Sequence, residues 1–421
     1  MKRTLLTTVL ALAIFLPASG NNDGVKDPQI AKDLQENLFR AGVNTCPYEY
    51  MPTEETPVPR GFKPFYISHY GRHGARSGTS SSYYPSVLDI FTRASEAGLL
   101  TPDGEKAFGY IKEVVRLHDG MDGRLTRLGT MEHRQIAGRM YSKYGKTVFG
   151  DRKRQKVRAV SSMVQRCIVS MTAFSGELLS RNPRLDFWWD TGERMQPIVH
   201  TSEGPVIRKD ARKIINDYTN RHRPDTVAFY DRMFTCPDSA RTIVGNCSRL
   251  VHEFTRMGCA CAAQGMDDFM LRCIDEDYLY HYTVSRCMSL YLRQCNSVEY
   301  GDARMQPVEL LVDDIIAKAD EVIGGSDVAA DLRFGHDYQL LAIASRLGVS
   351  GVAERLDRNS CQSWQGYFYT PFACNLQMVF YRNRAGEVLV KFYINEREAR
   401  CTLLDGGPYY RWEDLKRAIK K

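Results

Sequence analysis

Three junctions, each joining an apolar strand-like run to charged side chains, constrain the fold of this chain more than any other feature. They lie at residues 65–76, 157–171 and 332–348, and the last two continue with apolar residues at helical spacing. Where strands alternate with helices, the sheet is mainly parallel, and the loops at the carboxyl ends of its strands converge on one crevice. The sequence therefore predicts an α/β fold, with a mainly parallel sheet flanked by helices, in which these three loops meet.

The first junction ends in Arg72-His73-Gly74-Ala75-Arg76, which places an imidazole between two guanidinium groups. Arginine presents a planar fork of donors that matches phosphate oxygens, and a neutral imidazole nitrogen can attack phosphorus. In isolation, such a basic pentapeptide is as often a solvated surface turn. The other two junctions are needed to decide between these interpretations.

The second and third junctions carry residues suited to the same anion. Arg166 falls in a predicted first helical turn, where free backbone N–H groups and the helix dipole favour negative charge. His336 and Asp337 open another predicted helix, which Gly348 ends. Taken singly, Arg166 is equally well a surface arginine, and Asp337 a simple helix cap. Taken together, the three loops predict one phosphate-binding site.

These motifs resemble those of the histidine acid phosphatase family, the branch of the histidine phosphatase superfamily that includes phytases and multiple inositol polyphosphate phosphatases. The family's Arg-His-Gly-x-Arg motif and distant His-Asp pair match Arg72 to Arg76 and His336-Asp337. Residues 158–174 are similar to its middle arginine segment, and Leu125 to Gly129, with Gly138, to its Leu-Thr-x-x-Gly stretch. The resemblance spans roughly residues 60 to 400.

The resemblance implies a role for each matching residue. His73 is the implied nucleophile and Asp337 the implied proton donor. The implied phosphate ligands are Arg72, Arg76, Arg166 and His336. Clustered arginines disperse the charge of a phosphoryl transition state by electrostatics alone, so no metal and no other cofactor is expected. The implied reaction is hydrolysis of a small phosphorylated substrate through a phosphohistidine intermediate.

An acidic pH optimum follows from these roles. Three arginines disfavour protonation of His73, which keeps its lone pair available below the ordinary imidazole pKa of about 6.5. Asp337 must hold a proton to release an alkoxide, and bound phosphate should raise its pKa. A rate that climbs steadily from about pH 5 to about pH 8 would contradict this assignment.

The substrate is left open by the loop that follows the first motif. Many phytases have a lysine there, whereas residues 77–82 are Ser, Gly and Thr only. Other basic residues could substitute for this lysine, although the residues in question are more simply interpreted as a solvated helix face. They are Arg208, Lys209, Arg212 and Lys213. Inositol phosphates such as phytate and the broad substrates of a scavenging acid phosphatase both remain, ahead of a phosphomutase or a non-catalytic phosphate-binding protein.

Residues 1–20 have the features of a signal peptide. Lys2-Arg3 precede an apolar run from Leu5 to Leu16, and small residues follow up to Gly20. The run is too short to span a bilayer, so export to a periplasm or beyond is predicted, without membrane insertion. In such a compartment some of the twelve cysteines are expected to form disulfides, although their connectivity cannot be read.

The spacing of the junctions predicts the domain organisation. Residues 21–175 and 326–421 are assigned to the α/β core, and residues 176–325 to an inserted, mainly helical cap. Two apolar runs at 378–381 and 388–393 predict a hairpin near the end. The net charge of +7 becomes +5 once Lys2 and Arg3 are removed, and the scattered basic residues argue against nucleic-acid binding. Oligomeric state is not determined by the sequence.

Overall fold

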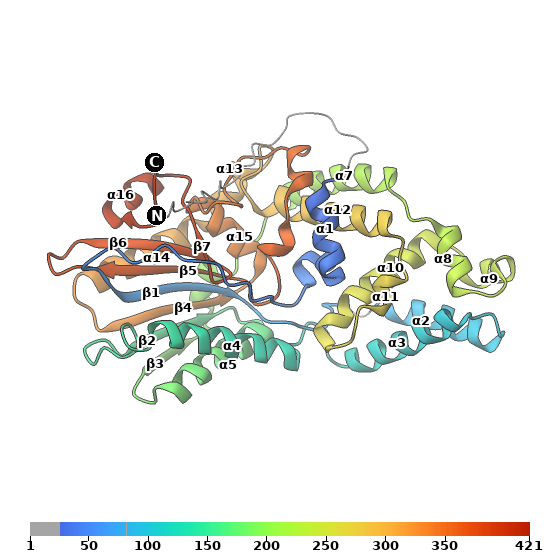
Figure 1. Ribbon diagram of the computed structural model, residues 1–421, viewed down its shortest axis with the longest axis horizontal. Coiled ribbons are helices and arrows are strands. Elements are labelled where there is room, and N and C mark those ends of the chain that lie inside the picture. The colour runs from blue at the N-terminus through green and yellow to red at the C-terminus, as the bar shows by residue number, and fades with distance from the viewer. Residues whose placement is uncertain (1–25, 81) are drawn as a thin grey trace, which may run out of the picture.

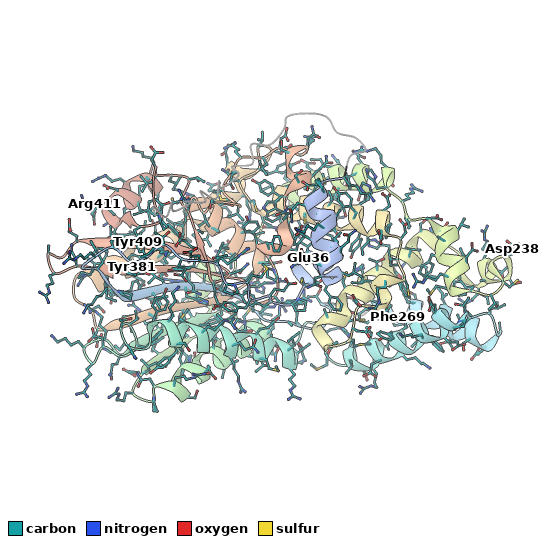
Figure 2. All side chains as sticks on the ribbon, in the orientation of Figure 1. Glu36, Asp238, Phe269, Tyr381, Tyr409 and Arg411 are labelled. Atoms are coloured by element: carbon teal, nitrogen blue, oxygen red, sulfur yellow. The ribbon has the colours of Figure 1, made fainter. Side chains whose placement is uncertain are left out.

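The computed structural model describes residues 26–80 and 82–421, so the predicted signal peptide lies outside the described residues. A sheet with helices on both faces occupies one end of the molecule, and a region built of helices occupies the other (Figure 1). The predicted α/β architecture with a helical part is confirmed. In Figure 2, Tyr381 and Tyr409 lie at the sheet end, whereas Phe269 and Asp238 lie in the helical region.

The central sheet has eight strands in the order β3-β2-β4-β1-β5-β6-β7, with β8 paired to β6. Its first four strands in this order run parallel, and the remaining strands are antiparallel to their neighbours. The predicted hairpin is formed by β5 and β6. The strands are β1 (Lys63–Arg72), β2 (Lys156–Ser161), β3 (Asp186–Asp190), β4 (Val328–Gly335), β5 (Asn375–Arg382), β6 (Val388–Ile394), β7 (Arg397–Ala399) and β8 (Tyr410–Arg411).

Alternating side chains of β1 pack against two different helical layers. Ile67 and His69 face the layer of α4 (Arg127–Tyr144) and α5 (Gln165–Arg181), where the His69 ring lies 5.1 Å from that of Phe174. Tyr66 and Tyr70 belong to the larger core on the opposite face. That face is covered by α14 (Glu309–Ile323), α15 (Asp337–Arg346) and α16 (Trp412–Ile419) (Figure 1). Burial on both faces is typical of a sheet with a parallel core.

The helical region draws on more of the chain than residues 176–325. Val87, Phe91 and Ala94 of α2 are buried, and the Phe91 ring stacks 6.0 Å from that of Phe254 in α10. The elements of this region are α2 (Tyr84–Glu96), α3 (Pro102–His118), α7 (Pro205–Arg221), α8 (Thr226–Met233), α9 (Pro237–Val244), α10 (Cys247–Cys261), α11 (Phe269–Arg272) and α12 (Glu276–Gln294). Residues 84–118, assigned above to the core, thus pack with the cap because their apolar faces match its helices.

Strand β3 lies beyond residue 175, in the part of the chain assigned above to the cap. It belongs to the sheet, because it pairs in parallel with β2. At the other end of the chain, α1 (Pro28–Glu36) and the 3₁₀ segment η1 (Leu38–Thr45) lie beside α12 of the helical region (Figure 1). The remaining short helices are α6 (Gln196–Val199), α13 (Gly301–Met305), η2 (Glu193–Met195), η3 (Ala262–Gln264), η4 (Gln306–Val308), η5 (Ser360–Ser363) and η6 (Gly366–Phe368).

The cysteines differ from expectation, since all twelve lie within the described range and all are free thiols. Ten are buried, Cys247 is half-buried and Cys236 is exposed. Buried thiols act as small apolar side chains, so they fill the core without cross-linking it. Over the described part of the chain, no helix is both long and apolar enough to cross a membrane.

Candidate active site

The three loops meet at one edge of the sheet, as their positions in the sequence predict. Arg72, the last residue of β1, pairs with Gly335, the last residue of β4. One residue further on, the His73 N–H donates to the Gly335 carbonyl at 3.0 Å, and the Ser162 N–H donates to the Phe334 carbonyl at 2.9 Å. Backbone pairing therefore continues past the strands and delivers all three loops to their common carboxyl edge.

His73 is buried, and its surroundings define which nitrogen can react. Its Nδ1 lies 2.9 Å from the Gly74 carbonyl, which can only accept, so Nδ1 carries the hydrogen and Nε2 the lone pair. The pKa of His73 is held well below its ordinary value by burial, followed by the charges of Arg72, Arg76 and Arg166. The imidazole is thus neutral, with Nε2 free for attack on an electrophile.

The three predicted arginines do gather around His73. Phe372 lies under two of them, with its ring centroid 4.9 Å from the Arg72 guanidinium and 5.9 Å from that of Arg76. The pKa of Arg76 falls to about 9 because of burial and the repulsion of Arg72 and Arg166. Among residues 26–80 and 82–421, none accepts a hydrogen bond from the buried Nε atoms of these three arginines. Like charges held together with unused donors form a site for an anion.

Asp337 is the first residue of α15, but it does not cap that helix. Its Oδ2 accepts a 2.7 Å hydrogen bond from Nδ2 of Asn44 and lies 3.5 Å from Nη2 of Arg72. Burial alone would raise its pKa, yet Arg72, Asn44 and His336 lower it on balance. The capping interpretation is therefore wrong, because the side chain points to the arginine cluster rather than to its own helix.

His336 lies beside His73, with the two ring centroids 5.5 Å apart and nearly perpendicular. Its ring stacks on that of Tyr338 at 4.9 Å, and the ring of His200 lies 4.7 Å away. Burial, together with the charges of Arg166 and His200, lowers the pKa of His336 to about 3. A neutral His336 can donate one hydrogen bond to an anion bound against His73.

Several neighbours of the site escaped the sequence analysis. His200 lies beside His336, although it belongs to a segment without any motif. His133 of α4 packs against the rings of Phe174 and Phe334. Tyr338 follows the His-Asp pair directly and was within reach of sequence reasoning. Asn44 has no sequence signal, since its position depends on contacts almost three hundred residues away.

The Leu-Thr-x-x-Gly stretch packs against the loop that carries His73. A Cβ on Gly74 would lie 2.3 Å from the Gly129 carbonyl oxygen, so the two backbones touch where neither residue has a side chain. Thr126 Oγ1 donates to the Ala75 carbonyl at 3.0 Å. The buried Glu132 carboxylate accepts from the Ala75 N–H at 2.6 Å and from the Tyr48 N–H at 2.9 Å. These contacts fix the loop that carries His73.

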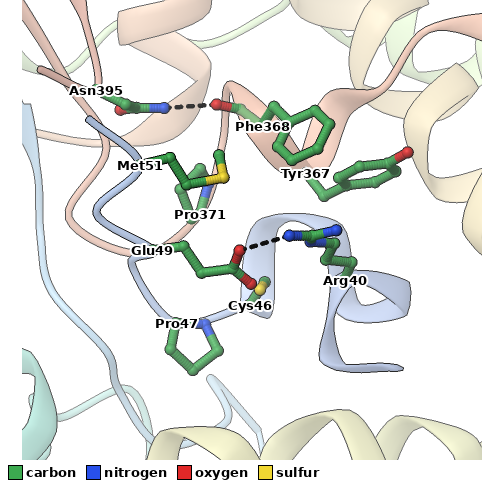
Figure 3. Close-up of a pocket in the computed structure, with 9 residues that line it drawn as sticks. All are labelled: Arg40, Cys46, Pro47, Glu49, Met51, Tyr367, Phe368, Pro371 and Asn395. Atoms are coloured by element: carbon green, nitrogen blue, oxygen red, sulfur yellow. Dashed lines mark hydrogen bonds and ion pairs between the residues drawn. The ribbon is translucent and has the colours of Figure 1, made fainter. Parts of the chain in front are cut away.

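A small hollow adjoins the site but does not include it (Figure 3). Inside it, Nη2 of Arg40 is paired with the Glu49 carboxylate at 2.8 Å. The hollow is lined by Arg40, Cys46, Pro47, Glu49, Met51, Tyr367, Phe368, Pro371 and Asn395. It touches the site through Pro371, whose carbonyl accepts from Nη1 of Arg72 at 3.1 Å. Its one guanidinium is already paired, so it does not compete with the arginine cluster as an anion site.

No protein-family model matches the chain, and no curated protein sequence does either. Solved structures do match. The Bifidobacterium longum multiple inositol polyphosphate phosphatase in complex with inositol hexasulfate has a TM-score of 0.71 at 15% identity, covering 90% of this chain and 97% of that chain. The chain has the fold of this phosphatase.

Two phytases extend the comparison. The D. castellii phytase has a TM-score of 0.67 at 13% identity, over 95% of this chain and 89% of that chain. The Hafnia alvei phytase in complex with myo-inositol hexakis sulphate has a TM-score of 0.54 at 13% identity, over 86% and 98% of the two chains. The predicted resemblance to histidine acid phosphatases is thus confirmed for the fold, and the geometry of the site carries the argument about activity.

Proposed function

We propose that this protein is a histidine acid phosphatase that hydrolyses phosphate monoesters through a phosphohistidine at His73. The observation that carries the proposal is the neutral His73, with Nε2 free, enclosed by three guanidinium groups and flanked by His336 and Asp337. A nucleophile, an anion site and a carboxyl group lie together at one edge of the sheet. That combination serves phosphoryl transfer better than reversible binding, because binding needs neither the nucleophile nor the acid.

In the first step, Nε2 of His73 attacks phosphorus while the bond from phosphorus to the ester oxygen breaks. Asp337 gives its proton to the departing oxygen, which leaves as an alcohol. The arginines and His336 hold the three remaining phosphoryl oxygens and disperse their charge. In the second step, water attacks the phosphohistidine, the Asp337 carboxylate takes a proton from that water, and His73 is released with phosphate.

An acidic working range belongs to this proposal. His73 stays neutral in acid because burial and the arginines lower its pKa. Asp337, whose pKa is also lowered before substrate binds, is protonated only at low pH. A phosphate dianion beside it raises that pKa, so the protonated acid is most available in the substrate complex. Metal independence follows from the arginines alone and is tested with a chelator.

Inositol phosphates are the proposed substrates. The matching B. longum and H. alvei proteins were solved with inositol hexasulfate and its myo-inositol equivalent. In this chain, two of the helix α7 cations considered above are paired with acids, Arg208 with Glu203 and Lys213 with Asp210. Arg256 of α10 instead lies 4.0 Å over the ring of Tyr83, which directly precedes α2. We propose it as the cation that binds a second phosphate.

Export is proposed on the predicted signal peptide alone, with a periplasmic or secreted enzyme as the result. A broad-specificity scavenging phosphatase is the second candidate, favoured by the uncharged loop of residues 77–82. A phosphomutase is less favoured, because it must keep water from its phosphohistidine while Asp337 here stands ready to activate water.

The deciding experiment compares kcat/KM for phytate and for an aryl phosphate at about pH 5 in the presence of a chelator. A clear preference for phytate supports an inositol phosphatase, whereas equal values support the scavenging enzyme. Turnover of neither substrate would overturn the proposal. Loss of turnover in chelator that returns with added metal would overturn its metal independence.

A further inference from the structure

Segment η1 inserts one side chain between the helical region and the arginine cluster. Nδ2 of Asn44 donates to Oδ2 of Asp337 at 2.7 Å, across 293 residues of sequence. Oδ1 of Asn44 accepts from Nη2 of Arg286 at 2.8 Å. The Asn44 backbone carbonyl accepts from Nη1 of Arg72 at 2.6 Å. A residue outside every motif therefore touches the proposed proton donor, a proposed phosphate ligand and the helical region.

The chemistry of Arg286 fixes the orientation of the Asn44 amide. A guanidinium has donors only, so the amide atom that faces Arg286 must be the oxygen. The NH2 group then faces Asp337, and Oδ2 of Asp337 must accept. Arg286 is itself held by the Gly42 carbonyl, to which its Nη2 donates at 2.9 Å. The orientation is thus set by a residue of α12, in the helical region, and not by the sheet.

We propose that Asn44, oriented by Arg286, is a positioning residue for Asp337: it engages Oδ2 as an acceptor and so leaves Oδ1 to carry the proton given to the leaving group. The inference rests on the proposed function, because it assigns a task to one oxygen of the proposed acid. It adds that the packing of helix α12 adjusts both the direction and the acidity of that acid.

The Asn44 bond also favours the charged form of Asp337, since it is donated to the carboxylate. Removing it should raise the pKa of Asp337 and extend activity to higher pH. Other groups act on the same carboxyl and stay in place when Asn44 is changed. Those that face Asp337 are Arg72, Arg76, Arg166, His336, Tyr338 and Cys374.

The test measures kcat/KM against pH for three full-length variants, with a simple alkyl phosphate and 4-nitrophenyl phosphate as substrates. Asn44→Ala removes both side-chain bonds, and the near-isosteric Asn44→Asp keeps the bond to Arg286 while placing a carboxylate against Asp337. Arg286→Met leaves the Asn44 amide free to rotate. A melting curve for each variant verifies that it folds. If Asn44→Ala does not fold, Asn44→Asp still allows the test.

We expect the basic limb of the profile to move up by about one pH unit in Asn44→Ala, further in Asn44→Asp, and least in Arg286→Met. The alkyl phosphate, whose leaving group needs the proton, should lose about tenfold in kcat/KM, and the aryl phosphate much less. If Asn44 had only a structural role, kcat/KM would fall equally for both substrates and the basic limb of the pH profile would not move.

Asn37→Ala is the matched control, because Asn37 caps the same segment by accepting from the Phe39 N–H at 3.0 Å. It should leave both the limb and the substrate ratio unchanged. An unmoved limb in Asn44→Asp, with the wild-type protein active on both substrates, would overturn the inference alone. An inactive wild-type protein would overturn the proposed function, which keeps the two failures distinct.

Discussion

The two sides of the candidate site are built in different ways. On the sheet side, His73 and Ser162 are placed by backbone hydrogen bonds that continue the strand pairing by one residue. On the helical side, Asn44 and Arg286 are placed by side-chain bonds between segments more than two hundred residues apart. The groups proposed to react are thus held in place by the sheet. The groups proposed to adjust the direction and acidity of Asp337 are instead held by tertiary packing.

The largest effect is expected from the sheet side. His73→Ala should lower kcat by at least about four orders of magnitude, because it removes the nitrogen on which the proposed phosphoenzyme forms. Steady-state rates with an aryl phosphate, together with acid-quench trapping of the labelled phosphoenzyme, measure this. An unchanged melting curve verifies the fold. Substantial residual turnover in a folded variant would refute covalent catalysis.

Asp337→Asn tests the residue at which the two sides meet. The amide keeps the size of the carboxyl but cannot give up a proton, so kcat for an alkyl phosphate should fall by about two to three orders of magnitude. With 4-nitrophenyl phosphate the first step should be nearly normal, and the burst of nitrophenol shows it. Equal losses for both leaving groups in that burst would argue against a proton donor at this position.

The sheet side was largely predictable from the sequence. Strand-to-helix junctions place residues such as Arg72 and His336 at the carboxyl ends of strands, and parallel pairing then brings these ends together. The glycines of the motifs could also be recognised in the sequence, although their structural role could not. Gly74 and Gly129 leave room for a backbone contact between the nucleophile loop and the start of α4, which only the folded chain makes plain.

The helical side was not predictable, for a physical reason. Asn44 occupies a short 3₁₀ segment whose local sequence carries no periodic pattern, and its partners are set by long-range packing. The packing of residues 84–118 against the helical region was hidden for a similar reason, because an amphipathic helix shows that it has a buried face but not which layer covers it. Sequence patterns thus identified the residues proposed to react, but not the residues that surround them.

Glu132 offers a way to probe where the two sides are joined, since it binds the N–H of Ala75 and that of Tyr48. Burial raises its pKa to about 7, and the two N–H bonds only partly offset this. A carboxyl with a raised pKa favours folding when protonated, so its contribution is greatest in acid and declines as pH rises through the folded pKa. The linked decline in the free energy of unfolding is on the order of 3 kcal/mol between about pH 4.5 and pH 7.

Glu132→Gln should remove this decline. Urea unfolding at about pH 5 and about pH 8 measures the free energy of unfolding of both proteins. The buried His69 and His133, whose pKa values of about 3 act with the opposite sign, are present in both proteins and cancel in the difference. Parallel pH dependence in the two proteins would show that Glu132 is already ionised in the folded protein at about pH 5, and so would contradict a raised pKa.

The smallest effect is expected at the outer edge of the helical side. Arg256→Ala removes the cation that lies over Tyr83, and it should raise KM for phytate by about five- to tenfold while leaving the aryl phosphate unchanged, because only a polyanion reaches beyond the catalytic phosphate. Arg249→Ala, on the same helix and paired with Glu253, is the matched control. Equal KM changes in both variants would reflect loss of general positive charge rather than a site. A rise in KM for phytate confined to Arg256→Ala would show that the helical side contributes to substrate specificity, while the reacting groups lie on the sheet side.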